Sequence, residues 1–169
     1  MSPVMVADGT IPLRRAPTGV ADLLQSIRDV MQPQARALDV TLRLEIARDL
    51  PPAVLIDRRK IAWALTAVVG NALRYVRHGT SRMPGGSVVV AARTDTDTNQ
   101  VILEVQDDGP GISADTIRAT AAGIDEPRAG LALSMVRDVV GAHGGRLDIE
   151  SRMDAAGHGT TVRFRLPVV

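Results

Sequence analysis

The sequence predicts an α/β (α+β) two-layer sandwich, in which a mixed, largely antiparallel sheet carries about three helices on one face. Two observations lead to this fold class. The apolar periodicity changes along the chain in the order helix, strand, helix, hairpin, helix, hairpin, which differs from the regular alternation of a doubly wound parallel sheet. The chain is also long enough, with 169 residues of which 45% are hydrophobic, to bury a substantial core. We therefore expect one domain.

The first half of the chain is predicted to hold two long helices. Residues 1–18 contain several prolines and little periodicity, so we expect an extended lead-in rather than a packed element, followed by the domain over 19–169. Apolar residues at helical spacing predict a helix over 20–38, which Pro33 could kink or divide. The next expected elements are a strand over 40–46, a short strand over 53–56 and a helix over 58–76.

The second half is predicted to hold two hairpins and a third long helix. Alternating apolar residues indicate strands, and clusters of glycine and polar residues indicate the turns between them. The glycines after His143 are a stop signal for the long helix. The expected elements are strands over 87–93 and 101–106, a short helix over 113–122, a helix over 130–142, and strands over 146–150 and 160–166 around a loop over 154–159.

Composition excludes several classes of function. The 20 basic and 19 acidic residues are scattered, which favours a solvated mixed surface over a nucleic-acid patch. Trp63, Tyr75 and Phe164 are the only aromatic residues, too few for a base-stacking platform. The lack of cysteine excludes disulfides and thiolate metal sites, and the three histidines lack metal-ligand spacing. No apolar run approaches the roughly 20 residues that span a bilayer, and no signal peptide is recognisable, so we expect a cytoplasmic domain without membrane contact.

An acidic, glycine-rich turn after a strand is the most informative local feature. Residues 101–105 alternate between apolar and polar side chains, and Asp107 then precedes Asp108-Gly109-Pro110-Gly111. A carboxylate at a strand end can accept a hydrogen bond from an exocyclic amino group such as that of adenine. The glycines would let the backbone approach a ligand closely. Taken alone, the segment fits an ordinary turn equally well.

A polar residue interrupts the second long helix. Asn71 lies in a mostly apolar stretch, and its amide oxygen is a hard ligand suited to Mg²⁺. Arg74 and Tyr75, one turn later, could meet a phosphate and a nucleoside. An asparagine whose side chain is merely satisfied within the helix is the other interpretation of this segment.

Two further glycine-containing segments follow the acidic turn. Residues 128–132, Arg-Ala-Gly-Leu-Ala, open the third long helix, where free backbone N–H groups favour phosphate binding. Residues 157–160, Gly-His-Gly-Thr, lead into the last strand. Each of the two, by itself, is an ordinary helix start or turn.

Together these segments resemble the ATP-binding catalytic domain of sensor histidine kinases. The resemblance rests on "GNALRY", "DDGPGI", "AGLALSMVRDVVGAHGG" and "GHGTTVRFRLP" in this order, and it extends from about residue 18 to the C-terminus. It implies the Bergerat ATP-binding fold, which DNA gyrase, the ninety-kilodalton heat-shock chaperone and the MutL mismatch-repair ATPase share.

The resemblance also implies roles for individual residues. Asn71 would bind Mg²⁺, Asp107 would recognise adenine, and Asp57 and His143 would be structural. The residues that it assigns to ATP binding are Asn71, Arg74, Tyr75, Asp107, Gly109, Gly111, Ile112, Gly130, Leu131, Ala132, Gly159 and Thr160.

The chain departs from the family pattern at the phosphate side. Arg128 and Ala132 stand where the family has glycines, so Ala132 could weaken phosphate binding, while Arg128 joins Arg74 as a candidate phosphate contact. The segment between Gly111 and Gly130 is short, which predicts a small lid over ATP. Ala67 replaces the general-base glutamate of the superfamily's ATPases, which argues against a hydrolase.

The resemblance implies an ATP- and Mg²⁺-dependent protein histidine kinase that phosphorylates a histidine on a dimerisation and acceptor domain. None of the three histidines has the setting of a phosphoacceptor, so the expected partners are an acceptor domain of the same or another protein and a response regulator. The departures keep two alternatives open: a degenerate module that binds nucleotide weakly and acts through protein–protein interaction, and an anti-sigma-type serine kinase. We expect a cytoplasmic domain, either free or as the cytosolic part of a membrane-anchored sensor.

Overall fold

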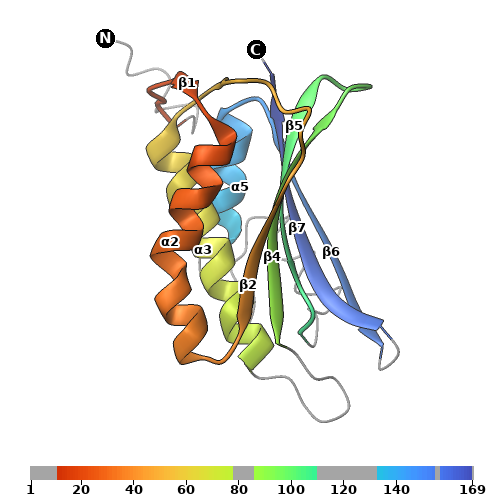
Figure 1. Ribbon diagram of the computed structural model, residues 1–169. Coiled ribbons are helices and arrows are strands. Elements are labelled where there is room, and N and C mark those ends of the chain that lie inside the picture. The colour runs from red at the N-terminus through yellow and green to blue at the C-terminus, as the bar shows by residue number, and fades with distance from the viewer. Residues whose placement is uncertain (1–10, 78–85, 110–132, 155–156, 169) are drawn as a thin grey trace.

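The computed structural model describes residues 11–77, 86–109, 133–154 and 157–168, which form two layers (Figure 1). Helices cover one face of a five-stranded sheet, so the predicted two-layer sandwich is confirmed. The helices are α2 (Val20–Ala37), α3 (Arg58–Arg77) and α5 (Leu133–Ala142). The strands, in their order across the sheet, are β2 (Thr41–Ile46), β4 (Ser87–Asp95), β5 (Gln100–Asp107), β7 (Gly157–Pro167) and β6 (Arg146–Asp154).

The sheet is mixed and largely antiparallel, as predicted. The pairs β4–β5, β5–β7 and β7–β6 are antiparallel, whereas β2 pairs parallel with β4. The chain between β2 and β4 contains α3, and a parallel pair requires such a crossover. β5 lies at the centre, and its residues Val101, Ile102 and Leu103 are fully buried. Side chains on both faces of the central strand are therefore covered.

A second, two-stranded sheet corrects the prediction for the N-terminal segment. β1 (Ala16–Thr18) pairs antiparallel with β3 (Val54–Ile56), and Thr18 is buried. The expectation of an unpacked lead-in is therefore wrong for the last three residues of 1–18. A three-residue strand is too short to show periodicity, and its partner lies far away in the sequence.

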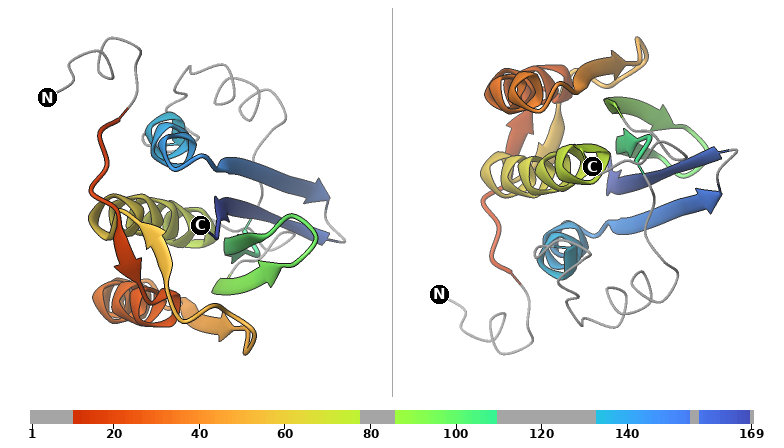
Figure 2. Two further views of the ribbon diagram at one scale, coloured as in Figure 1. Left: turned by 90° about the horizontal axis from the view of Figure 1, so that it is seen from above. Right: turned by 90° about the horizontal axis from the view of Figure 1, so that it is seen from below.

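α2 remains one continuous helix although Pro33 lies inside it. Its buried residues recur at helical spacing and pack against the sheet and α3, while Pro33 is exposed. The proline therefore removes a hydrogen bond only on the solvent side. Figure 2 shows α3 between α2 and α5 in the helical layer. In the described ranges, no helix combines the length and apolar character needed to cross a membrane.

The last hairpin is longer than predicted. β6 continues to Asp154 and β7 begins at Gly157, so most of the loop expected over 154–159 belongs to strands. Gly157, His158 and Gly159 lie in β7 rather than in a turn, because pairing with β6 determines their backbone conformation. The short helix expected over 113–122 and the start of the helix expected over 130–142 lie outside the described residues.

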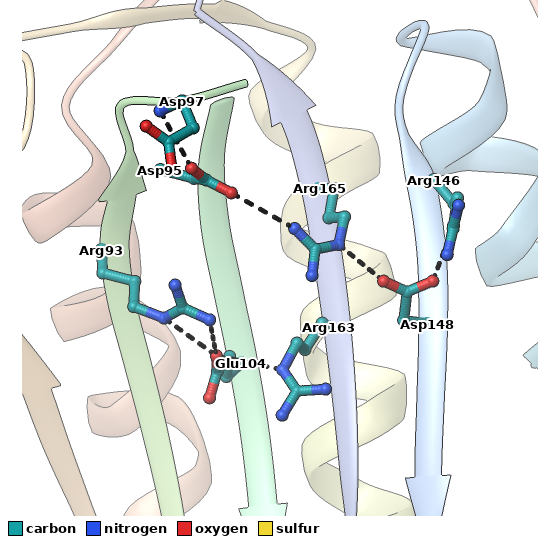
Figure 3. A network of polar contacts seen from close by, with 8 residues as sticks. All are labelled: Arg93, Asp95, Asp97, Glu104, Arg146, Asp148, Arg163 and Arg165. Carbon is teal, nitrogen blue, oxygen red and sulfur yellow. Dashed lines mark hydrogen bonds and ion pairs between the residues drawn. The ribbon is translucent and has the colours of Figure 1, made fainter. Parts of the chain in front are cut away.

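Arginine–carboxylate pairs cover the face of the sheet that is turned away from the helices (Figure 3). Glu104 accepts hydrogen bonds from Arg93 Nη2 at 2.8 Å and Arg163 Nε at 3.2 Å. Ile102 on the same face lies between Arg93 and Arg165 in the strand register and is fully buried. The aliphatic stems of the two arginines thus cover an apolar residue while their charges stay in solvent.

A buried polar link connects the start of α3 with the end of α5. The backbone N–H of Asp57 donates to His143 Nε2 at 3.0 Å, and His143 Nδ1 donates to the Val139 carbonyl at 2.8 Å. The Asp57 carboxylate accepts from the backbone N–H groups of Arg14 and Lys60, at 2.9 and 3.2 Å. Although burial raises it, these hydrogen bonds lower the pKa of Asp57. Asp57 and His143 therefore have structural roles.

This link predicts a pH-dependent stability. Burial lowers the pKa of His143, so the folded protein keeps the ring neutral while the unfolded chain protonates it below about pH 6.5. The contribution of His143 is complete above that pH and is lost as pH falls toward the folded pKa. We expect His143→Ala to lower the free energy of unfolding by about 1–3 kcal/mol at neutral pH, because the buried Asp57 N–H loses its acceptor.

Urea unfolding of both proteins between about pH 5 and pH 7.5 measures this effect. The difference in free energy of unfolding between the wild type and His143→Ala should shrink as pH falls. Asp107, whose raised pKa gives the opposite trend, is present in both proteins and cancels in the difference. A difference that stays constant over this range would contradict the proposed role of the neutral ring.

Candidate functional site

The end of β5 places a carboxylate in a nearly buried position. Asp107 is 7% exposed, and its Oδ1 accepts a hydrogen bond from the Gly109 N–H at 2.9 Å. Burial raises the pKa of Asp107 to about 6, although hydrogen bonds from the backbone of Gly109 and Thr160 oppose the shift. The carboxylate is mostly ionised at neutral pH and is shielded from water. Such a group is a strong acceptor for an amino group of a ligand.

The neighbouring Asp108 holds the turn in place, a role that the sequence analysis missed. Its Oδ1 accepts hydrogen bonds from the N–H groups of Gly86 and Ser87, both at 2.9 Å. Its own N–H donates to the Ser87 carbonyl at 3.3 Å. The turn is therefore tied to the beginning of β4. An aspartate before a glycine is a known signal for side-chain bonding to the backbone, but its partner lies 21 residues away in the sequence.

Gly159 allows β7 to pass close to the end of β5. A Cβ at this position would lie 2.2 Å from the Asp107 carbonyl oxygen, and its φ of +142° is one that other residues rarely adopt. The register pairs Thr160 with Asp107. The sequence predicted a loop at Gly159 and the start of a strand at Thr160, whereas the structure places both residues within β7, beside the Asp107 carboxylate.

Two further residues from the last hairpin support this end of β5. His158 Nδ1 donates to the Gly109 carbonyl at 2.7 Å. Thr160 is buried, and its Oγ1 lies 3.0 Å from Ser151 Oγ on β6. No role for His158 was predicted from the sequence. Its contact crosses from β7 to the acidic turn, 49 residues away along the chain.

Asn71 and Arg74 form a second polar group on α3. Asn71 is 8% exposed, and its Oδ1 accepts a hydrogen bond from Arg74 Nη2. Both residues line a groove of about 300 Å³ that also includes Met31 and Gln34 from α2. The guanidinium therefore orients the amide oxygen. Nothing is described of the Tyr75 side chain, although its backbone belongs to α3.

The two polar groups belong to elements that meet at one end of the molecule. In Figure 1, the C-terminal ends of α3 and β5 and the N-terminal end of β7 all lie at this end. Asp107, Gly109, Gly159 and Thr160 are thus brought together, with Asn71 and Arg74 on the adjacent helix. The remaining predicted site residues lie outside the described ranges: Gly111, Ile112, Arg128, Gly130, Leu131 and Ala132.

The donor set limits which metal site is possible here. In the part of the chain that the structure describes, no three His, Asp or Glu side chains form a group that could hold a metal ion. A metal at Asn71 would therefore depend on oxygen atoms of a ligand and of water. Mg²⁺ binds in this way, because it keeps several waters and shares phosphate oxygens with few protein ligands.

Comparison with known proteins assigns a class to this fold and site. The family described as histidine kinase-, DNA gyrase B- and HSP90-like ATPases matches residues 56–169. The chain therefore belongs to this ATP-binding family, which is the superfamily that its motifs indicated.

Within the family, the similar curated proteins are histidine kinases. Histidine protein kinase DivJ of Caulobacter vibrioides is 34% identical over 162 residues, which cover 89% of this chain and 25% of DivJ. The adaptive-response sensory kinase SasA of a Synechocystis species is 30% identical over 159 residues, which cover 90% of this chain and 39% of SasA. The chain thus spans well under half the length of these relatives.

Solved structures agree with this assignment in their fold. Full-length ShkA in complex with AMPPNP superposes with a TM-score of 0.77 at 26% identity, over 94% of this chain and 32% of ShkA. The nucleotide-free catalytic domain of histidine kinase ThkA has a TM-score of 0.75 at 19% identity, over 92% of this chain and 99% of that domain. At that identity the ThkA match shows the fold. The chain corresponds to the ATP-binding catalytic domain of sensor histidine kinases.

The close approach of β7 to β5 generates a mutational prediction. We expect Gly159→Ala to destabilise the protein by about 1–3 kcal/mol, because the methyl group would displace the Asp107 backbone and require a strained φ. Nucleotide binding should weaken with it. Thermal unfolding and ATP titration by calorimetry measure the two effects.

Gly141→Ala is the matched control. A Cβ at Gly141 in α5 has no atom within 4 Å, so this change should be neutral or stabilising by up to about 1 kcal/mol. If Gly159→Ala and Gly141→Ala lose the same amount of stability, the close approach of Gly159 to Asp107 is not the cause of the loss.

Proposed function

We propose that this domain binds ATP with the adenine amino group at Asp107 and Mg²⁺ at Asn71, and transfers the γ-phosphoryl group to a histidine of an acceptor domain. The observation that carries the proposal is the buried Asp107 carboxylate at the end of β5, held by backbone N–H groups from the acidic turn and from β7.

Asp107 has the capacity that adenine recognition needs. A carboxylate offers about four lone-pair positions, and the backbone N–H groups of Gly109 and Thr160 use two of them. In a buried site, an acceptor left unpaired costs much more than one exposed to water. Asp107 therefore favours a base that presents an amino group over one that presents a carbonyl group.

Asn71 and Arg74 fit the phosphate side of the ligand. The amide oxygen of Asn71 has two lone pairs, of which the Arg74 guanidinium takes one. The other suits Mg²⁺, which when bound neutralises negative charge on the phosphates. Arg74 is exposed, so its guanidinium can also contact a phosphate oxygen directly. Arg128, Gly130, Leu131 and Ala132 are proposed to complete this side, as their motif implies.

Phosphoryl transfer is favoured over hydrolysis by Ala67. This residue lines the same groove as Asn71 and has no group that could activate a water molecule. The acceptor is then a histidine nitrogen, which attacks the γ-phosphorus as the bond to the β–γ bridging oxygen breaks and ADP leaves. Catalysis by the protein consists of positioning and charge stabilisation.

The expected partners are an acceptor and dimerisation domain and a response regulator. Histidine kinase ThkA, similar in fold, has been crystallised in complex with the response regulator protein TrrA. For this chain, a cytoplasmic location is proposed because ATP and these partners reside there, whether the domain is free or part of a membrane-anchored sensor.

The proposal predicts a pH-dependent affinity for ATP. Because the pKa of Asp107 is raised to about 6, its ionised form is lost as pH falls through that value, and the dissociation constant should rise. Asp107→Asn should weaken binding at least about tenfold at neutral pH and remove this pH dependence. Calorimetric titration with Mg²⁺-ATP at several pH values measures both, with the exposed Asp29→Asn as control. A wild-type chain that does not bind ATP saturably contradicts the proposal.

A second prediction concerns the metal and the acceptor. We expect Asn71→Ala to slow phosphoryl transfer from labelled ATP to a candidate acceptor domain at least about tenfold. Gln34→Ala, in the same groove, should leave the rate unchanged. The phosphorylated product should be labile in acid, as phosphohistidine is. An acid-stable product would instead indicate a serine kinase.

A further inference from the structure

A basic cavity at the start of α3 is lined in part by the exposed Trp63. Its volume is about 590 Å³, and its lining includes Arg14, Arg58, Arg59, Lys60 and Trp63. In Figure 1, the N-terminal end of α3 lies at the end of the molecule opposite to the end of β5. The basic cavity is therefore separate from the candidate ATP site and independent of the function proposed for it.

The positive charge of the basic cavity is not neutralised by the carboxylate within it. Among the described residues of the lining, Asp57 is the one acidic residue, and its oxygens accept from the N–H groups of Arg14 and Lys60 and from Lys60 Nζ at 3.4 Å. Arg58 Nη2 donates to the neutral Ser26 Oγ at 3.3 Å. The guanidinium of Arg59 has no hydrogen bond or ion pair with any residue that the structure describes. In the described part of the lining, four cationic side chains thus surround one carboxylate that already accepts hydrogen bonds.

This excess of positive charge in the basic cavity contrasts with the rest of the surface. The chain as a whole has a net charge of only +1, and on the outer face of the sheet the arginines are paired with carboxylates (Figure 3). The exposed arginines of the basic cavity offer the same type of pairing to a carboxylate from another molecule. Charge complementarity therefore points to an acidic ligand.

Trp63 adds an apolar surface that a ligand of the basic cavity would also contact. It is the only tryptophan of the chain and is 43% exposed, although α3 has an otherwise well-buried apolar face. Tryptophan and arginine are the residue types enriched among those that dominate binding energy at protein interfaces. A ligand that fits both features carries carboxylates next to an apolar side chain.

The start of the helix does not itself offer an anion site. Asp57 caps α3, because its side chain accepts the Lys60 N–H and its carbonyl accepts the Ile61 N–H at 3.0 Å. An anionic ligand in the basic cavity would therefore be bound by side chains and not by the N-terminal N–H groups of α3. A small inorganic anion would use the cations but would leave the indole of Trp63 exposed.

We propose that the basic cavity binds an acidic segment of a partner protein, with carboxylates on Arg58 and Arg59 and an apolar side chain against Trp63. The volume lies within the range of about 300–1,000 Å³ that proteins use for ligand-sized groups. Nucleic acid fits less well, because the cations gather in one cavity with a single aromatic residue rather than forming a stripe.

The test uses the full chain and a labelled, capped hexapeptide of four glutamates and two leucines, followed by fluorescence anisotropy. We expect saturable binding that weakens as salt rises from about 50 to about 300 mM. Arg59→Glu and Trp63→Ala should each raise the dissociation constant about tenfold. Arg36→Glu, in the last turn of α2, makes the same charge change elsewhere and should alter it less than about twofold.

Three outcomes would overturn the proposal. The first is that the acidic peptide does not bind saturably, or that Arg36→Glu weakens it as much as Arg59→Glu. The second is that an oligonucleotide binds in the basic cavity more tightly than the peptide. The third is that Mg²⁺-ATP displaces the peptide, because the peptide would then occupy the nucleotide site. Thermal unfolding shows that each variant is folded, so a loss of binding reports on the surface.

Discussion

The arrangement of this domain depends on one close backbone approach, between Gly159 of β7 and Asp107 at the end of β5. Only a hydrogen atom fits there, since a Cβ would meet the Asp107 carbonyl at 2.2 Å. The approach brings the Thr160 backbone to the Asp107 carboxylate and lets His158 bind the Gly109 carbonyl. Asp108 then ties the same turn to β4. The carboxylate is buried and its pKa is raised because three strands meet around it.

α3 connects the two ends of the molecule and gives each a different chemistry. Its second half carries Asn71 and Arg74 beside the groove with α2, where an amide oxygen and a cation suit a metal–phosphate group. Its first two turns carry Arg58, Arg59, Lys60 and Trp63 of the basic cavity. Asp57 and His143 hold the first of these turns against α5 through buried hydrogen bonds. The two proposed sites, for nucleotide at the C-terminal end of α3 and for a partner at its N-terminal end, therefore do not overlap.

Most elements could be predicted because their periodicity is local. The helices over 20–38 and 58–76 and the alternating strands around 87–106 were recognisable from side-chain spacing, and they lie where expected. The errors have a common cause. Residues 16–18 form β1, and the loop expected over 154–159 is mostly strand, because a partner strand distant in the sequence supplies the hydrogen bonds. No local sequence pattern predicts such a partner strand.

The sequence by itself determined the class of fold and the family, and it supplied the candidate site residues, since Asn71, Asp107 and the glycine segments are recognisable by type and order. Only the tertiary structure decided how these residues act. The raised pKa of Asp107, the hydrogen bond between Asn71 and Arg74, and the roles of Asp108 and His158 all depend on burial and on contacts between separate elements. The basic cavity is likewise a product of folding, because Arg14, from the segment before β1, joins Arg58, Arg59 and Lys60 of α3 only in the folded chain.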